Sequence, residues 1–174
     1  MAESAEPEPT LNALSRQAAS EALTRCCGAT RWVQGMLARR PFASHTAMFA
    51  AAVEIWAQLG PEDYREAFSH HPEIGSDLGE LRKKFTKTAD WSQAEQSAAI
   101  GASEATLRAL RDGNQAYRAR FGHSFIVCAT GKSAAEMLAI LEQRLPSAPE
   151  RELSLAAAEL AKITRLRLEK ICPP

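Results

Sequence analysis

Two short polar groups in the middle of the sequence contain residue types that can bind or move protons. The first is His70-His71-Pro72, and the second runs from Ser92 to Gln96. Pro72 disfavours helical dihedrals in the residue before it, which predicts that a helix ends at His71. This leaves an imidazole, the side chain that gains and loses a proton near neutral pH, at a helix C-terminus.

Each group also has a purely structural interpretation. Either histidine could simply cap the last carbonyls of its helix. Ser92 and Glu95 have the spacing of a capping box, in which each side chain satisfies the other residue's backbone N–H. In the functional interpretation, Glu95 and Gln96 occupy the first turn of a helix, where free N–H groups favour an anionic ligand. The residues alone leave both interpretations open.

Three other groups of residues are not expected to form functional sites. A metal site from the two histidines and Glu73 lacks a further ligand cluster, and adjacent histidines diverge. Gly131-Lys132-Ser133 suggests a phosphate loop, but the glycine needed five residues earlier is Ile126, so Thr130 is expected to cap a helix instead. The arginines of Arg165-Leu166-Arg167-Leu168 are both expected in solvent, because a buried arginine needs an anionic partner.

The elements that position these groups are predicted to be helices, giving an all-α, single-domain bundle of about eight to nine helices. Apolar residues recur with helical spacing from Leu11 to Cys172, alanine is abundant and β-branched residues are sparse. Ser15, Ser44 and Ser103 are expected N-caps. The expected helices cover residues 15–26, 30–39, 44–59, 61–69, 77–85, 92–99, 103–121, 131–145 and 149–171.

One segment departs from the helical pattern. Phe125-Ile126-Val127-Cys128-Ala129 is a continuous apolar run with the composition of a strand. No partner strand is apparent, so the run is predicted to be a buried extended connection. Its backbone groups must then bond to other parts of the protein or to a polar ligand.

Composition limits the partners. The chain has 174 residues, with 21 basic and 21 acidic side chains and a formal net charge of zero, so no positive field favours nucleic acid or an anionic membrane. No apolar run is long enough to span a bilayer, and residues 1–10 are expected to be a disordered leader ahead of a domain at 11–174. Four cysteines without a Cys-x-x-Cys spacing favour free thiols in a reducing compartment, the cytoplasm.

The motifs taken together resemble the 2-oxo-4-hydroxy-4-carboxy-5-ureidoimidazoline (OHCU) decarboxylases of urate breakdown. The resemblance runs from Leu11 to about Ile171. Its landmarks, in order, are Cys26-Cys27 with Trp32, Arg40-Pro41-Phe42, His71-Pro72-x-Ile74-Gly75, Ser92-x-x-Glu95-Gln96, Phe121-Gly122 with Phe125–Ala129, and Arg165-Leu166-Arg167-Leu168. The chain departs from many members at His123 and Ser124, where an apolar residue and proline are usual.

The resemblance implies an all-α homodimer that acts without metal or organic cofactor. The implied reaction, a step of purine catabolism, converts OHCU to (S)-allantoin and carbon dioxide. By position, His71 is implied as the proton donor, Glu95 as its acidic partner and Arg167 as the arginine of the catalytic site. The implied substrate-binding residues are Pro72, Ser92, Gln96, Phe125, Ile126, Val127, Cys128 and Ala129.

Two alternatives belong to other classes of protein. In the first, the chain is a non-catalytic helical interaction domain whose His-Pro and Glu-Gln groups are caps. In the second, it is a different cofactor-free lyase or hydrolase on the same helical frame. Convergence of His71, Glu95 and Arg167 on one pocket would argue against the first, and substrate screening would separate the second.

Overall fold

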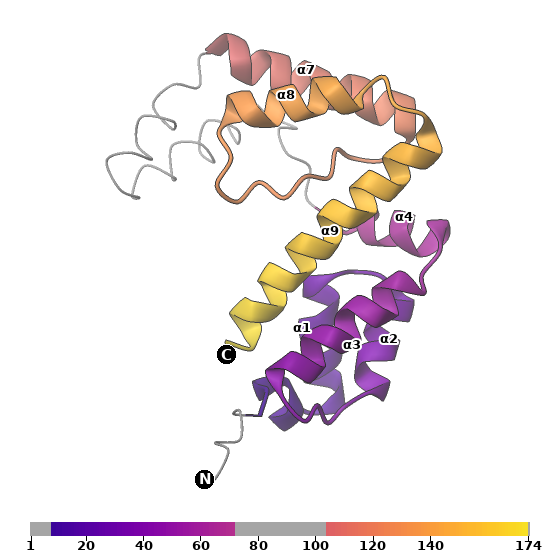
Figure 1. The fold of residues 1–174 in the computed structure, drawn as a ribbon, viewed down its shortest axis with the longest axis vertical. Coiled ribbons are helices and arrows are strands. Elements are labelled where there is room, and N and C mark those ends of the chain that lie inside the picture. The colour runs from indigo at the N-terminus through magenta and orange to yellow at the C-terminus, as the bar shows by residue number, and fades with distance from the viewer. Residues whose placement is uncertain (1–7, 72–103, 174) are drawn as a thin grey trace, which may run out of the picture. The chain divides into compact units, whose positions relative to one another are not determined.

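A computed structural model describes residues 8–71 and 104–173, and every regular element within them is a helix (Figure 1). The all-α prediction is confirmed for these residues. The expected helices at 77–85 and 92–99, and residues 1–7 of the expected leader, lie outside them. In chain order the elements are η1 (Thr10–Ala13), α1 (Arg16–Cys26), α2 (Thr30–Ala38), α3 (His45–Ala57), α4 (Pro61–Ser69), α7 (Glu104–Phe121), α8 (Ala134–Arg144) and α9 (Pro149–Ile171).

The starts of α1 and α3 follow the capping chemistry expected from the sequence. The Ser15 hydroxyl accepts a hydrogen bond from the Ala18 N–H at 3.1 Å, and the Ser44 hydroxyl does the same for Ala47 at 3.1 Å. These bonds satisfy N–H groups that have no partner within the helix. Ser103 lies outside the described residues.

The start of α8 differs from the prediction. Ser133, and not Thr130, is the N-cap, and it forms a capping box with Glu136. Gly131, which lies between Thr130 and Ser133, has a φ of +73°. This left-handed conformation continues the turn, so the helix begins only at Ala134. Gly122 ends α7 with a φ of +75°, as expected of a glycine at that position.

The chain divides into two compact units, each described by itself. Unit 1 consists of residues 1–70 and 157–174, and unit 2 consists of residues 71–156. Helix α9 contributes its first turns to unit 2 and the remainder to unit 1. Among the described residues, no helix is both long enough and apolar enough to cross a membrane.

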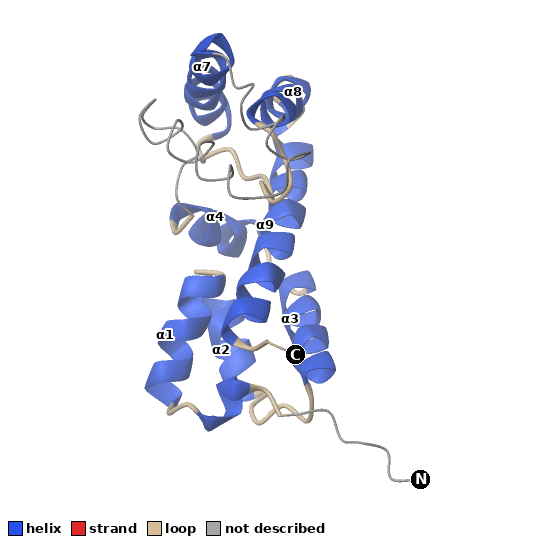
Figure 2. Cartoon of the chain, turned by 90° about the vertical axis from the view of Figure 1, so that its left-hand side faces the viewer, coloured by secondary structure: helices blue, strands red, loops and turns tan. Residues whose placement is uncertain are grey.

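Unit 1 is built around α2, which contacts α1, α3 and α4 (Figure 2). Trp32 on α2 is fully buried, and its indole N–H donates to the Ala52 carbonyl on α3 at 3.1 Å. The landmark arginine at position 40 has a structural role, because its guanidinium donates to the carbonyl of Asn12 at 3.0 Å. Asn12 in turn bonds to both backbone groups of Phe42, which fixes the loop before α3.

Unit 2 is built around α7 and α8, which pack side by side (Figures 1 and 2). Leu110 on α7 and Met137 on α8 are fully buried in its core. Gly113 allows this close approach, because a Cβ there would lie 2.7 Å from the Leu141 side chain. The other buried members of the same core are Leu107, Tyr117, Phe125, Val127, Ala134 and Leu141.

The buried face of α9 differs from the predicted apolar stripe. Helical spacing predicts that five apolar residues of 149–171 face the core: Leu153, Leu160, Ile163, Leu166 and Ile171. Of these, only Leu160 is buried, and the other four are half-buried. Five buried positions recur every four residues and include two polar side chains, and Ala157 is buried beside them: the five are Glu152, Ala156, Leu160, Thr164 and Leu168. Hydrophobic pattern alone missed this face because a buried polar side chain with a hydrogen-bond partner looks like a surface residue in sequence.

Candidate active site

The described residues include part of the predicted site from each unit. His71 and Phe125–Ala129 belong to unit 2, and Arg167 belongs to unit 1. Pro72, Ser92, Glu95 and Gln96 lie outside the described residues, so their predicted roles stay predictions. The geometry of the site is therefore given for each unit in turn.

Arg167 points at the end of helix α1. Its Nη1 donates to the carbonyls of Arg25 and Cys26, each at 3.2 Å. These carbonyls belong to the last turn of α1, where no intrahelical partner is available and the helix dipole is negative. The expectation that both arginines of the Arg-Leu-Arg-Leu motif are solvated is wrong for Arg167, which is half-buried.

Arg165, two residues earlier, behaves as the expected solvated arginine. It is exposed, its Nε bonds to Glu169 at 2.9 Å, and its guanidinium lies 4.5 Å from the centre of the Phe49 ring. Residues two apart on a helix face different directions. This separates the two arginines of the motif and leaves Arg167 as the one directed at the neighbouring helix.

The turn after α1 brings His70 to the same place. Gly28 has a φ of +87°, and a Cβ at this position would lie only 2.7 Å from the His70 Cβ. Only glycine permits both the left-handed conformation and this close approach. The turn formed by Cys26, Cys27 and Gly28, called here the α1 turn, thus contacts Arg167 through its carbonyls and His70 through its glycine.

Two acidic residues fix α4, the helix that ends beside the α1 turn. The Glu66 carboxylate accepts from the Thr30 N–H at 3.0 Å and from the Thr30 hydroxyl at 2.6 Å, and so caps the start of α2. Asp63 pairs with Arg31 at 2.8 Å. Because α4 ends at Ser69, as Pro72 predicted, these contacts determine where the chain passes through His70 to the half-buried His71.

The two cysteines of the α1 turn are not nucleophiles at neutral pH. Burial raises the pKa of the Cys26 thiol to about 11 and that of the Cys27 thiol to about 12. The nearby Arg167 charge opposes the effect on Cys26 without overcoming it. The reactive form of cysteine is the thiolate, so both side chains act as packing groups.

In unit 2, Phe125–Ala129 is the buried extended connection that the sequence predicted. Residues 125–128 are buried, Ala129 is half-buried, and none of the five lies in a helix or strand. The carbonyl of Ile126 accepts from Arg144 Nη1 at 2.8 Å, and that of Cys128 accepts from Lys132 Nζ at 2.8 Å. Side chains therefore supply the partners that a neighbouring strand would otherwise provide.

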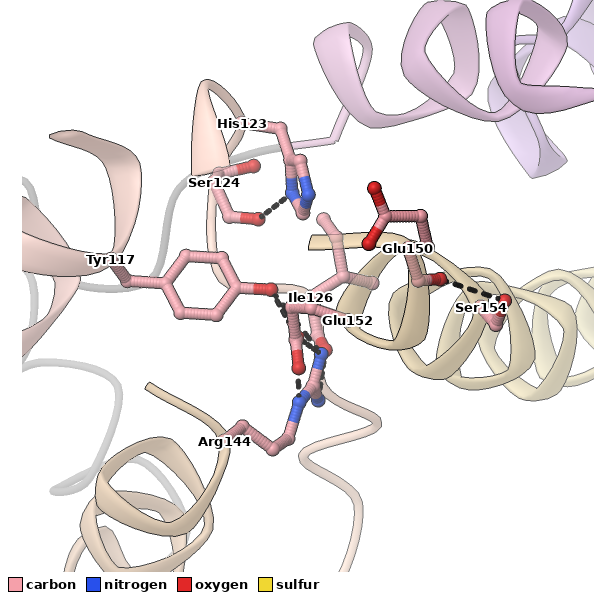
Figure 3. Close-up of polar contacts among 8 residues, drawn as sticks. All are labelled: Tyr117, His123, Ser124, Ile126, Arg144, Glu150, Glu152 and Ser154. Carbon is pink, nitrogen blue, oxygen red and sulfur yellow. Dashed lines mark hydrogen bonds and ion pairs between the residues drawn. The ribbon is translucent and has the colours of Figure 1, made fainter. Parts of the chain in front are cut away.

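A polar cluster holds this segment, and sequence reasoning did not find it (Figure 3). Arg144, at the end of α8, bonds through Nε to Glu152 Oε1 at 2.9 Å and through Nη2 to the Tyr117 hydroxyl at 3.4 Å. Tyr117 also donates to Glu152. The side chains of Arg144 and Glu152 are only 8% and 0% exposed.

The cluster contains a buried ion pair between Arg144 and Glu152. Burial and the bond to Glu152 raise the pKa of Tyr117, so the phenol stays protonated and donates to the carboxylate. The Arg144 guanidinium also lies 4.9 Å from the centre of the Phe125 ring. One signal in the sequence points to the cluster, because Glu152 lies four and eight residues before the apolar Ala156 and Leu160 on one helical face.

Unit 1 supplies the Arg167 guanidinium and a histidine, His70, that contacts the α1 turn, and unit 2 supplies the backbone groups of Phe125–Ala129. Among residues 8–71 and 104–173, no group of three His, Cys, Asp or Glu side chains is placed to hold a metal ion. A guanidinium suits a planar anionic or amide-bearing ligand, and an imidazole suits proton transfer.

Comparisons with known proteins show the family of the chain. The family model described as OHCU decarboxylase matches residues 12–169. The chain is 38% identical over 149 residues to the "Uric acid degradation bifunctional protein TTL" of Arabidopsis thaliana, covering 84% of this chain but 45% of that protein. It thus spans less than half the length of that relative.

Two further matches cover most of both chains. The 2-oxo-4-hydroxy-4-carboxy-5-ureidoimidazoline decarboxylase of Amia calva is 33% identical over 141 residues, 77% of each protein. A solved structure described as OHCU decarboxylase in the presence of (S)-allantoin is similar with a TM-score of 0.70 and 34% identity, covering 87% of this chain and 96% of that one.

Proposed function

Because the chain belongs to the OHCU decarboxylase family, we propose that it converts OHCU to (S)-allantoin and carbon dioxide in urate catabolism. The observation that carries the proposal is a structural similarity to a decarboxylase whose structure was determined with (S)-allantoin present. The similarity covers 96% of that decarboxylase chain. The non-catalytic alternative does not explain this similarity.

The substrate itself explains why the proposed reaction proceeds without a cofactor. In OHCU a C=N bond adjoins the carbon that carries the carboxylate. When the bond to the carboxylate breaks, carbon dioxide leaves and the electron pair moves to the ring nitrogen, which takes up a proton. The resulting enol then loses its hydroxyl proton and gains one at C5. The protein must position the substrate, handle these protons and stabilise charge.

The proposed roles follow the chemistry of each side chain. His71, oriented by Glu95, handles the 4-hydroxyl proton and donates a proton as the carboxylate is lost. Arg167 binds a planar substrate group through two parallel hydrogen bonds. The support for this assignment is that the α1 turn contacts both Arg167 and His70, the residue bonded to His71.

The remaining predicted residues complete the proposal. Ser92, Gln96, Pro72 and the backbone of Phe125–Ala129 contact the ureido and ring amide groups. A homodimer rests on the family resemblance. A cytoplasmic location is supported by the four cysteines, all of which are free thiols.

Optical activity of the product tests the reaction. Spontaneous decay of OHCU gives racemic allantoin, so the purified protein should yield a product with the circular dichroism of the S enantiomer. His71→Asn should abolish this enrichment while the far-UV spectrum stays helical. A racemic product formed at the uncatalysed rate by the unsubstituted protein would refute the proposal, and an active His71→Asn variant would remove His71 from the mechanism.

A further inference from the structure

The Arg144 cluster lies against the segment that the proposed function assigns to substrate binding. One guanidinium bonds to Tyr117 on α7, to Glu152 on α9 and to the Ile126 carbonyl in the middle of the segment. Figure 3 shows the Arg144 head group directed at Glu152 and Ile126, with the Tyr117 ring approaching from α7. Three parts of unit 2 therefore meet at one side chain.

The geometry of these bonds requires arginine. Its Nε and Nη2 donate to one carboxylate oxygen, while Nη1 donates in another direction to the Ile126 carbonyl. A guanidinium holds these donors on three nitrogen atoms in one rigid plane, whereas the three N–H donors of a lysine ammonium all belong to one nitrogen atom. The position of the Ile126 carbonyl is thus tied to the orientation of the buried carboxylate.

Stability alone is a weak reason for such a pair. Removing two charges from water costs free energy, and well-packed apolar residues of similar volume often stabilise a protein as much as or more than a buried ion pair. Glu152 also has a second buried oxygen, Oε2, for which no hydrogen-bond partner occurs among the described residues. Stability therefore does not account for the pair. Its bond to the Ile126 carbonyl is better explained by a role in positioning that segment of the backbone.

We infer that Arg144, held by Glu152 and Tyr117, is a positioning residue that fixes the backbone of Phe125–Ala129 for substrate binding. The inference rests on the proposed function, because that function makes the segment a substrate contact. Arg144 itself is buried behind the segment and does not touch the substrate. Its loss should therefore weaken substrate binding and stereochemical control more than it slows the chemical step.

The decisive experiment separates positioning from stability with the double variant Arg144→Met/Glu152→Leu. This variant replaces the ion pair with apolar side chains of similar volume, so the thermal midpoint should stay near that of the unsubstituted protein. The KM for OHCU should rise about tenfold, with kcat reduced less and the enantiomeric excess of allantoin lowered. An unchanged KM and enantiomeric excess in the folded double variant would overturn the inference.

Two further variants make the test complete. Arg144→Lys keeps the charge beside Glu152 but loses the fork, so it should raise KM in the same way, and it decides the question if the double variant does not fold. A normal KM for Arg144→Lys would then overturn the inference. The control is Arg120→Met in the same unit, whose exposed guanidinium donates to the Ser147 carbonyl at 3.1 Å and whose loss should leave the kinetics unchanged.

The unsubstituted protein distinguishes this inference from the function on which it rests. If it produces (S)-allantoin and the variants behave normally, only the positioning role fails. If it produces no optically active allantoin, the proposed function fails and the inference fails with it.

Discussion

Arg144 in unit 2 and Arg167 in unit 1 both donate to backbone carbonyls, but in different electrostatic surroundings. Arg144 is buried against the Glu152 carboxylate, so the protein itself neutralises its charge. Arg167 is half-buried, and its Nη1 donates to the carbonyls of Arg25 and Cys26. Those contacts orient the guanidinium.

This difference separates a positioning role from a catalytic one. A buried cation that is bound to a buried anion cannot reach a substrate, whereas the half-buried Arg167 side chain remains accessible to one. The comparison therefore predicts that substitution of Arg167 impairs the reaction itself. Substitution of Arg144 acts through the backbone it holds.

The largest expected effect is that of Arg167→Met. It should lower kcat/KM for OHCU by about 100-fold or more, because a preorganised charge contact to the reacting substrate is lost. The thermal midpoint should change little, since the residue is only half-buried. Steady-state kinetics and a thermal scan measure both quantities.

The matched control for Arg167→Met is Arg165→Met, two residues away on the same helix. Arg165 is exposed and pairs with Glu169, so its loss should leave kcat/KM within about twofold of the unsubstituted value. An equal fall in kcat/KM in the two variants would contradict a specific catalytic role for Arg167.

An intermediate effect is expected for Gly28→Ala in the α1 turn. A left-handed alanine costs about 1–2 kcal/mol, and its Cβ would press on His70 at 2.7 Å. We expect a loss of stability in urea denaturation together with about a tenfold fall in kcat/KM, because His71 is displaced with its neighbour.

Gly131→Ala provides the control for this variant in unit 2. Gly131 has a φ of +73°, but a Cβ there has no atom within 4 Å. The strain should therefore cost a similar free energy while activity is retained. If both variants lost activity equally, the loss in Gly28→Ala could not be attributed to the contact between Gly28 and His70.

The smallest effect is a pH dependence of stability from Cys27. Burial raises the pKa of this thiol to about 12, against about 8.5 in an unfolded chain. The neutral thiol therefore stabilises the fold below pH 8.5, and this contribution is lost as the pH rises toward 12. The free energy of unfolding should fall by about 1 kcal/mol from this residue between pH 8 and 9.5. Cys27→Ala should flatten that fall, and an equal slope in the two proteins would contradict the prediction.

The fold was largely predictable because it depends on local signals. Serine N-caps, Pro61 and Pro149 at first helical positions, and alanine-rich amphipathic stretches set helix boundaries within a few residues. The start of α8 was misplaced because Thr130 and Ser133 are both plausible caps, and the choice depends on the left-handed Gly131.

The site was less predictable, because its contacts join residues that are distant in sequence. Arg167 bonds to a carbonyl 141 residues away, and periodicity carries no information about such a pair. Arg144 and Glu152 were missed for a related reason, since a charged residue is assigned to the surface unless its partner is known. Here the resemblance to a family supplied Arg167, whereas nothing in the sequence motifs supplied Arg144.

Unit 1 is assembled from two segments that are distant in the sequence, and this affects the order in which the two units can fold. Its first part ends at residue 70, and its second part begins at residue 157. Thr10, near the start, bonds to the carbonyl of Ile171, near the end. Unit 2 is continuous and can therefore fold while the chain is still being made. The first helices complete unit 1 only when α9 has been made, so the proposed catalytic arginine is put in place after the whole of unit 2 has been synthesised.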